Sequence, residues 1–81
     1  MSDAVEEIRR VVDAHGRLPV AAATVADDAD LYEAGMTSHA SVSVMLALED
    51  AFDIEFPDEM LTREVFESIA SMARAIEQLR A

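Results

Sequence analysis

Two residues with evident chemical potential, Ser38 and His39, stand where a loop gives way to a helix. The sequence up to Gly35 has loop character, whereas apolar residues recur at helical spacing from Ser38 to Phe52. At the start of a helix the first N–H groups lack backbone partners, and the peptide dipoles leave a partial positive charge. Ser38 can therefore be an N-cap that accepts a hydrogen bond, or a point at which a phosphate is attached. This stretch alone favours the cap, because serine is common in that position.

A serine beside a histidine also has the residue types of a nucleophile and its base. However, neighbours at the start of a helix point about 100° apart, and no third group that could orient His39 is evident. The strand–turn–helix context of a nucleophile elbow is absent as well. We therefore predict no catalytic residue, and we expect that the chain is not an enzyme.

Composition excludes several further classes of function. The 81 residues carry a net charge of −11, which argues against nucleic acid and anionic membranes and favours partners with basic surfaces. With two histidines and no cysteine, and with acids at 27–30 that lack calcium-loop spacing, we expect no metal site. No apolar run approaches a membrane span, and the N-terminus lacks a signal-peptide pattern. We expect a monomeric, cytoplasmic protein with one domain over residues 1–81.

Hydrophobic periodicity predicts three substantial helices. The first is expected to begin with Asp3 as its N-cap and to end at His15, with Gly16 in the left-handed conformation that often follows a helix. The second covers residues 38–52, and the last begins after Ser68 as its N-cap. We expect a long connection over residues 17–37 and a short helix over 58–66. With no strand signal, the prediction is an all-α four-helix bundle with a long first loop and a short third helix.

The second helix is expected to present two different faces. Its core face would comprise Ser41, Val44, Met45, Leu48 and Phe52. Two large apolar residues, Val42 and Leu46, fall on the opposite side, one turn apart and close to Ser38. A docking face combines apolar contact with flanking charge, so we predict that partners dock on His39, Val42, Leu46, Glu49 and Asp50. The alternative is that Leu46 packs under the long connection.

Several short motifs together resemble those of acyl and peptidyl carrier proteins. They are Gly35-Met36-Thr37-Ser38, Val42, Ala47-Leu48-Glu49, and Phe-Asp-Ile-Glu-Phe-Pro-Asp-Glu at 52–59. Each is weak alone, but the combination is specific, and the similarity covers essentially the whole chain. The resemblance implies the same four-helix layout and a covalent 4′-phosphopantetheine on Ser38, which holds an acyl group as a thioester. With the resemblance, we favour the modified serine over the plain cap.

The residues that differ from the usual motif of that family indicate which group the protein carries. Thr37 replaces the usual aspartate or histidine, His39 replaces leucine, and Ala40 and Ser43 replace acids that are common in fatty-acid carriers. Residues 61–69 look more like peptidyl and D-alanyl carriers. The resemblance therefore implies a carrier of an amino acid or small acyl group, modified by a phosphopantetheinyl transferase, loaded by a discrete ligase and used by downstream acyl-accepting enzymes. The alternatives are a carrier of fatty-acid or polyketide-type chains and an unmodified helical interaction domain.

Overall fold

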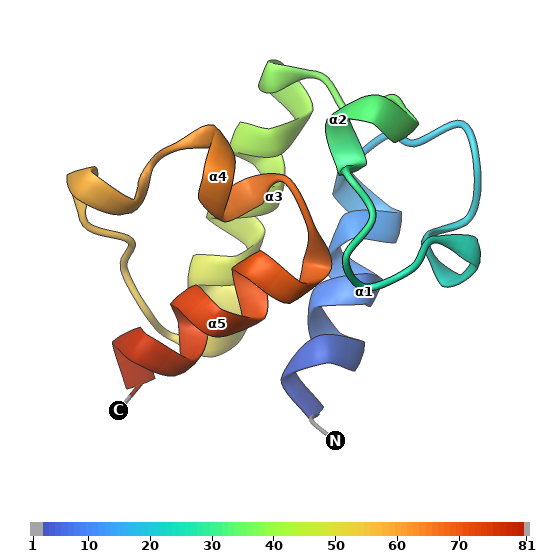
Figure 1. Ribbon diagram of the computed structural model, residues 1–81. Helices are drawn as coiled ribbons and strands as arrows, with labels where there is room; N and C mark the ends of the chain where they lie inside the picture. Colours follow the sequence, from blue (N-terminus) through green and yellow to red (C-terminus); the bar gives the residue numbers. More distant parts are fainter. Residues whose placement is uncertain (1–2, 81) are drawn as a thin grey trace.

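The computed structural model describes residues 3–80, apart from the side chains of Asp3 and Ala23, and this part of the chain contains helices and no strand (Figure 1). The elements, with 3-10 turns labelled η, are α1 (Asp3–His15), η1 (Ala22–Thr24), α2 (Leu31–Ala34), α3 (Ser38–Phe52), η2 (Asp58–Met60), α4 (Arg63–Phe66) and α5 (Ile69–Arg80). The predicted all-α fold, with three substantial helices and a short one before the last, is confirmed. The capping role expected of the Asp3 side chain lies outside the described part.

The core lies where α1 packs against α3 and α5. Its largest fully buried side chains are Ile8 and Val12 of α1, Leu31 of α2, Val44 and Leu48 of α3, and Ile69, Met72 and Ile76 of α5. Within each long helix these residues are three, four or seven positions apart, so each helix buries one apolar stripe. Across residues 3–80, no helix has the length and apolar character needed to cross a membrane.

The helix α3 begins at the end of the molecule that lies away from the start of α1 and the end of α5 (Figure 1). Its buried stripe consists of Ala40, Val44 and Leu48. The other three residues expected on the core face, Ser41, Met45 and Phe52, are half-buried. The stripe is thus rotated toward Ala40, because a helical wheel gives the period of a helix but not the neighbours that cover its edges.

The connection between α1 and α3 was expected to be loop, but it contains η1 and α2 and is fastened to α1. The guanidinium of Arg9 donates hydrogen bonds to the carbonyl oxygens of Ala22 and Val25, both at 2.6 Å, and pairs with Asp27. The carboxylate of Asp13 accepts a hydrogen bond from the backbone N–H of Ala22 at 2.9 Å. These contacts satisfy the N–H of Ala22 and the carbonyl oxygen of Val25, and they add a second bond to the carbonyl oxygen of Ala22, which also accepts from the N–H of Val25 at 3.1 Å.

The far side of the connection is fastened to the C-terminal part of the chain. The N–H of Leu31 donates to the carbonyl oxygen of Glu67 at 2.6 Å, and the N–H of Ala70 donates to that of Asp27 at 2.8 Å. Leu31 itself is fully buried. The connection therefore lies fixed between α1 and the α4–α5 segment, and it delivers the chain to the start of α3 in one position.

The end of α1 differs from the expectation. The left-handed residue is Arg17, with φ of 56°, and not Gly16. Gly16 is needed for a different reason: a Cβ atom there would lie 2.7 Å from the carbonyl oxygen of Val12, to which the Gly16 N–H is hydrogen-bonded. The expectation was wrong because glycine serves here for close approach of the backbone, not for positive φ.

The short helix expected over residues 58–66 is divided into η2 and α4. Leu61 and Thr62 separate the two elements, and the Thr62 hydroxyl accepts a hydrogen bond from the N–H of Val65 at 3.4 Å. A threonine in extended conformation that accepts such a bond is an N-cap, so the chain starts a new helix at this point. Phe66 of α4 is buried and packs edge-on against Phe56, with ring centroids 5.3 Å apart.

We predict that the Arg9→Gln substitution lowers the free energy of unfolding by about 1–3 kcal/mol, because the carbonyl oxygens of Ala22 and Val25 both lose the guanidinium donor, and only that of Ala22 keeps a second bond, from the N–H of Val25. Arg10→Gln is the matched control, since Arg10 is exposed and pairs with Glu7 of its own helix. Urea unfolding followed by circular dichroism measures both. Equal midpoints for the two variants would show that the Arg9 contacts do not stabilise the connection.

Candidate functional site

The cap of α3 is Thr37 and not Ser38. Thr37 has extended backbone angles, with φ of −85° and ψ of 164°, and its hydroxyl oxygen accepts a hydrogen bond from the N–H of Ala40 at 3.0 Å. Ser38 is the first residue of the helix. The interpretation of Ser38 as a plain cap is therefore wrong, because threonine is an adequate acceptor one position earlier. The sequence contained this signal in the Thr-Ser pair.

The Ser38 hydroxyl has no structural task among the described residues. Its side chain is exposed, and no described residue exchanges a hydrogen bond with it, whereas the Ser38 carbonyl oxygen accepts one from the Ser41 hydroxyl at 2.7 Å. Capping by Thr37 leaves the Ser38 oxygen free for chemistry. A phosphate joined to it would stand in the first turn of a 15-residue helix, where negative charge is favoured.

A tight corner before α3 sets the position of Ser38. Gly35 has φ of 125°, and a Cβ atom there would lie 2.8 Å from the ring of Pro19. Only glycine combines this conformation with this close approach. The next residue, Met36, is buried, and its N–H donates to the carbonyl oxygen of Leu31 at 2.9 Å. The exposed serine is thus held by a buried neighbour two residues before it.

An open groove of about 460 Å³ lies beside Ser38, between α3 and the segment from Leu61 to Phe66. Val42, Met45, Leu61 and Phe66 form its apolar part. Its polar part consists of Tyr32, Ser38, Ser41, Thr62 and Arg63. Residues of α2, α3 and α4 therefore meet at one hollow that also contains the free hydroxyl.

The apolar pair expected on the outer side of α3 is exposed. Val42 is 51% exposed and Leu46 is 56% exposed, so the alternative that Leu46 packs under the connection is wrong. His39 and Asp50 are also exposed. Leu61, at 45% exposure, adds an apolar residue that the sequence analysis did not single out. The sequence placed Leu61 inside the short helix expected over residues 58–66, so its exposure followed only from the division of that helix into η2 and α4.

Glu49 is half-buried and takes part in the fold. One of its carboxylate oxygens accepts a hydrogen bond from the N–H of Phe56 at 2.9 Å. This contact holds the chain after α3 against that helix, where Asp53 takes a left-handed conformation. Of the two acids expected to steer partners, only Asp50 is therefore free of such a bond within the described residues.

The groups required for catalysis do not gather at Ser38. His39 is exposed, and its side chain makes no hydrogen bond to another described residue. Across residues 3–80, no group of three or more histidine, aspartate or glutamate side chains could hold a metal ion. Two of the three acids at 27–30 have other partners, since Asp27 pairs with Arg9 and Asp30 caps α2.

A free serine hydroxyl at the start of a helix, set beside an open groove and with no base next to it among the described residues, suits the attachment of a group better than catalysis. Residues 9–76 match the family model for the phosphopantetheine attachment site, and the chain belongs to this family. The free, exposed Ser38 hydroxyl fits such a group. Proteins of this family carry groups and are not catalysts, so the expectation that the chain is not an enzyme is confirmed.

Relatives and solved structures share both the sequence and the fold. The chain is 52% identical over 65 residues to an aminoacyl carrier protein of Agrobacterium fabrum, which covers 80% of this chain and 78% of the relative. It is similar to a carrier protein from Agrobacterium tumefaciens complexed with an engineered Bradyrhizobium japonicum glycine:carrier protein ligase and ATP. That match has a TM-score of 0.90 and 45% identity, and covers 93% of this chain and 97% of the other.

A second solved structure contains a Bradyrhizobium japonicum glycine:carrier protein ligase complexed with a glycylated carrier protein. Here the match has a TM-score of 0.79 at 30% identity, and it covers 91% of this chain and 99% of the other. The fold described above is therefore that of proteins that have been seen in complex with such ligases.

We predict that Thr37→Ala lowers the free energy of unfolding by about 1 kcal/mol, the usual cost of losing an N-cap. Ser38→Ala, one residue away, should leave it nearly unchanged, because the Ser38 hydroxyl accepts no capping bond. Thermal melts of the two unmodified variants measure the difference. A larger loss for Ser38→Ala than for Thr37→Ala would contradict the assignment of the cap.

Proposed function

We propose that this single-domain protein is an aminoacyl carrier whose 4′-phosphopantetheine is attached to Ser38 and holds an amino acid as a thioester. The observation that carries the proposal is the free, exposed hydroxyl of Ser38 at the start of α3, next to a threonine that performs the capping. Membership of the phosphopantetheine family and the similarity to aminoacyl carriers support it.

The residues around Ser38 prepare the site without taking part in bond formation. Thr37 holds the first turn of α3, while Gly35 and Met36 fix the corner before it. The first-turn N–H groups of α3 favour an anionic substituent at Ser38. The bound group supplies a thiol at the end of a flexible arm, and the protein supplies a rigid point of attachment.

The packing of the core supports a small cargo. Ile8, Leu48, Met72 and Ile76 are fully buried along the middle of the bundle, and close-packed interiors leave little free volume. A long acyl chain would have to displace such side chains. Two of the similar structures contain ligases named for glycine. We therefore favour a small amino acid, with glycine as the first to test, over fatty-acid or polyketide-type chains.

The partners follow from this role. A phosphopantetheinyl transferase would modify Ser38, a discrete ligase of the glycine:carrier protein type would load the arm, and a downstream acyl-accepting enzyme would take the amino acid. The carrier would act as a cytoplasmic monomer. Its charge of −11 favours partners that present basic surfaces to it.

We predict that co-expression with a phosphopantetheinyl transferase adds one phosphopantetheine to the protein, and that Ser38→Ala removes this addition without unfolding the bundle. Subsequent incubation with glycine, ATP and a glycine:carrier protein ligase should add one glycyl group. Intact-mass spectrometry measures both steps. Ser41→Ala is the matched control, because Ser41 is one turn further along α3 and should leave both additions intact.

The attachment proposal fails if peptide mapping finds the arm on Ser41 or Ser43. An unchanged mass after co-expression would favour the unmodified interaction domain. If the protein isolated from its native cell carried long-chain thioesters, the aminoacyl proposal would be wrong while the attachment at Ser38 would stand.

We further propose that the ligase docks on the outer face of α3. Any enzyme that acts on the arm must approach the start of this helix, and Val42 and Leu46 present exposed apolar surface there. His39 and Asp50 flank the pair, and Leu61 extends it toward the groove. Glu49 lies on the same face, but its bond to Phe56 makes it unsuitable for charge reversal. Apolar contact should dominate, because of the two acids on this face only Asp50 is free of a side-chain bond within the described residues.

We predict that Val42→Asp or Leu46→Asp lowers the rate of loading by the ligase about tenfold or more, equivalent to about 1.4 kcal/mol of binding. Val20→Asp is the matched control, because Val20 is 50% exposed but lies in the connection between α1 and η1. Loading rates are measured on modified proteins whose circular dichroism matches that of the parent. Full-rate loading of a folded Leu46→Asp protein would show that the ligase recognises another surface.

A further inference from the structure

Arg63, the first residue of α4, is a positioned cation beside the docking face proposed for α3. Its guanidinium carbon lies 4.3 Å from the centre of the Tyr32 ring, and its side chain is 62% exposed. Stacking on an aromatic ring holds the planar guanidinium in place but leaves its N–H edges available. Arg63 lines the same groove as Val42 and Leu61, so a partner that covers these two apolar residues also reaches the guanidinium.

The acidic neighbour of Arg63 is engaged in the fold. Nη2 of Arg63 and Oδ2 of Asp30 are 3.9 Å apart, which is too far for a hydrogen bond. Oδ1 of Asp30 accepts from the N–H groups of Tyr32 and Glu33, at 2.9 and 3.3 Å, and caps α2. Asp30 therefore neutralises Arg63 only in part, and the guanidinium keeps donors for a partner.

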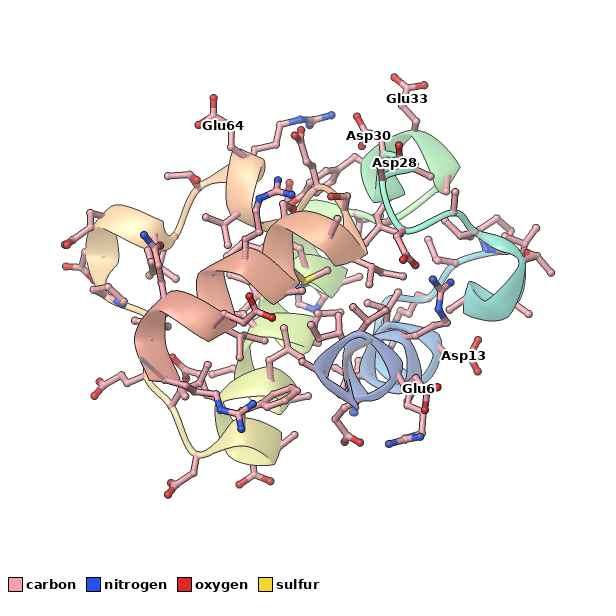
Figure 2. All side chains as sticks on the ribbon, turned by 60° about the horizontal axis from the view of Figure 1, so that its bottom comes forward. Glu6, Asp13, Asp28, Asp30, Glu33 and Glu64 are labelled. Carbon is pink, nitrogen blue, oxygen red and sulfur yellow. The ribbon has the colours of Figure 1, made fainter. Side chains whose placement is uncertain are left out.

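The sign of this charge is opposite to that of its surroundings. The edge of the molecule where α2 and α4 lie carries the side chains of Asp28, Asp30, Glu33 and Glu64 (Figure 2). The helix α3 contains no arginine or lysine, and the whole chain carries a net charge of −11. A partner that approaches this side therefore meets a negative surface in which Arg63 is a positive point.

Covering Arg63 places a demand on the partner. A charged group that is removed from water without a new acceptor raises the free energy of the complex. A carboxylate meets the demand best, because it matches both the charge and the paired N–H groups of a guanidinium edge. A basic side chain at the same point would be repelled, so Arg63 also disfavours partners whose surface is basic throughout.

The two charges beside the apolar pair of α3 give the docking face a direction. Arg63 lies across the groove from the first turns of α3, where Ser38 and Val42 line it. The exposed acid Asp50 lies about 18 Å further along α3 than Ser38. A surface of one sign attracts an opposite surface in many orientations, whereas charges of both signs at fixed places define one register.

We propose that Arg63 sets the orientation of the carrier on its ligase by pairing with a carboxylate that the ligase presents within an otherwise basic surface. The inference rests on the proposed attachment at Ser38 and on the proposed docking on α3. Orientation matters to the reaction, because the arm leaves from Ser38 and must enter the ligase at one place. Arg63 is thus a positioning residue, which selects ligases that have the matching carboxylate.

The test measures loading of the phosphopantetheine-modified full chain by a glycine:carrier protein ligase, with variants whose circular dichroism matches that of the parent. Arg63→Gln should lower kcat/KM about threefold to tenfold and Arg63→Glu about tenfold to a hundredfold, mainly through a higher KM. Arg63→Lys should retain part of the rate, since lysine keeps the charge but not the paired donors. Arg74→Glu is the matched control, because it changes the net charge equally at an exposed position of α5 outside the groove, and it should stay within about twofold of the parent.

Two further measurements separate pairing with the ligase from other effects of the substitution. Ser38→Ala carriers have no arm, so their strength as competitive inhibitors of parent loading reports the protein surface alone. Adding Arg63→Glu to Ser38→Ala should weaken this inhibition, whereas adding Arg74→Glu should not. Replacing exposed ligase carboxylates by lysine, one at a time, should identify one ligase variant that loads Arg63→Glu faster than it loads the parent carrier.

The outcomes distinguish this inference from the proposals on which it rests. A parent protein that gains no arm or no glycyl group overturns the proposed function, and the orientation role falls with it. If the parent is loaded and Leu46→Asp is slow, but Arg63→Glu matches Arg74→Glu, the function and the docking face stand and the orientation role is overturned. A loss in Arg63→Glu that no ligase variant restores overturns the pairing with a carboxylate.

Discussion

The position of the α3 start depends on the hydrogen bonds that fasten the connection between α1 and α3. Arg9 binds two carbonyl groups of this connection on one side, and the N–H of Leu31 binds Glu67 on the other. A segment of this length would otherwise sample many conformations, and each ordered residue costs about 1–2 kcal/mol of conformational entropy. Because both sides are held and Leu31 is buried, the corner at Gly35 and the residues after it occupy one place.

A division of tasks between adjacent residues follows from that placement. Thr37 satisfies the helix terminus, and the Ser38 hydroxyl is left exposed without a hydrogen bond to another described residue. A single residue could not do both, since a hydroxyl oxygen that is esterified and carries a bulky substituent is a poorer acceptor for a backbone N–H. Across the groove, Asp30 also has one main structural role. Its carboxylate caps α2, and the charge of Arg63 is therefore only partly neutralised.

Local signals predicted the features that arise from periodicity and from short motifs. The bounds of α3, the exposure of Val42 and Leu46, and the family all followed from residues that are close in sequence. Features made by distant residues could not be predicted in this way. Arg9 reaches residues 13 to 18 positions away, and the Glu49–Phe56 bond depends on how the chain turns after α3. Gly16 shows that the role of a glycine is also hard to predict from the sequence. The residue type is the same whether glycine is needed for a positive φ or for close approach of the backbone.

The opposed placement of the α3 start and the outer ends of α1 and α5 has a practical consequence (Figure 1). A fluorescent label, a surface anchor or a fused enzyme joined at either of those ends would sit on the side away from Ser38. The molecule, with principal extents of 32, 27 and 19 Å, would act as a spacer between that attachment and the free hydroxyl. Such a geometry suits immobilised assays, in which many copies can be arrayed with the same face exposed to enzymes in solution.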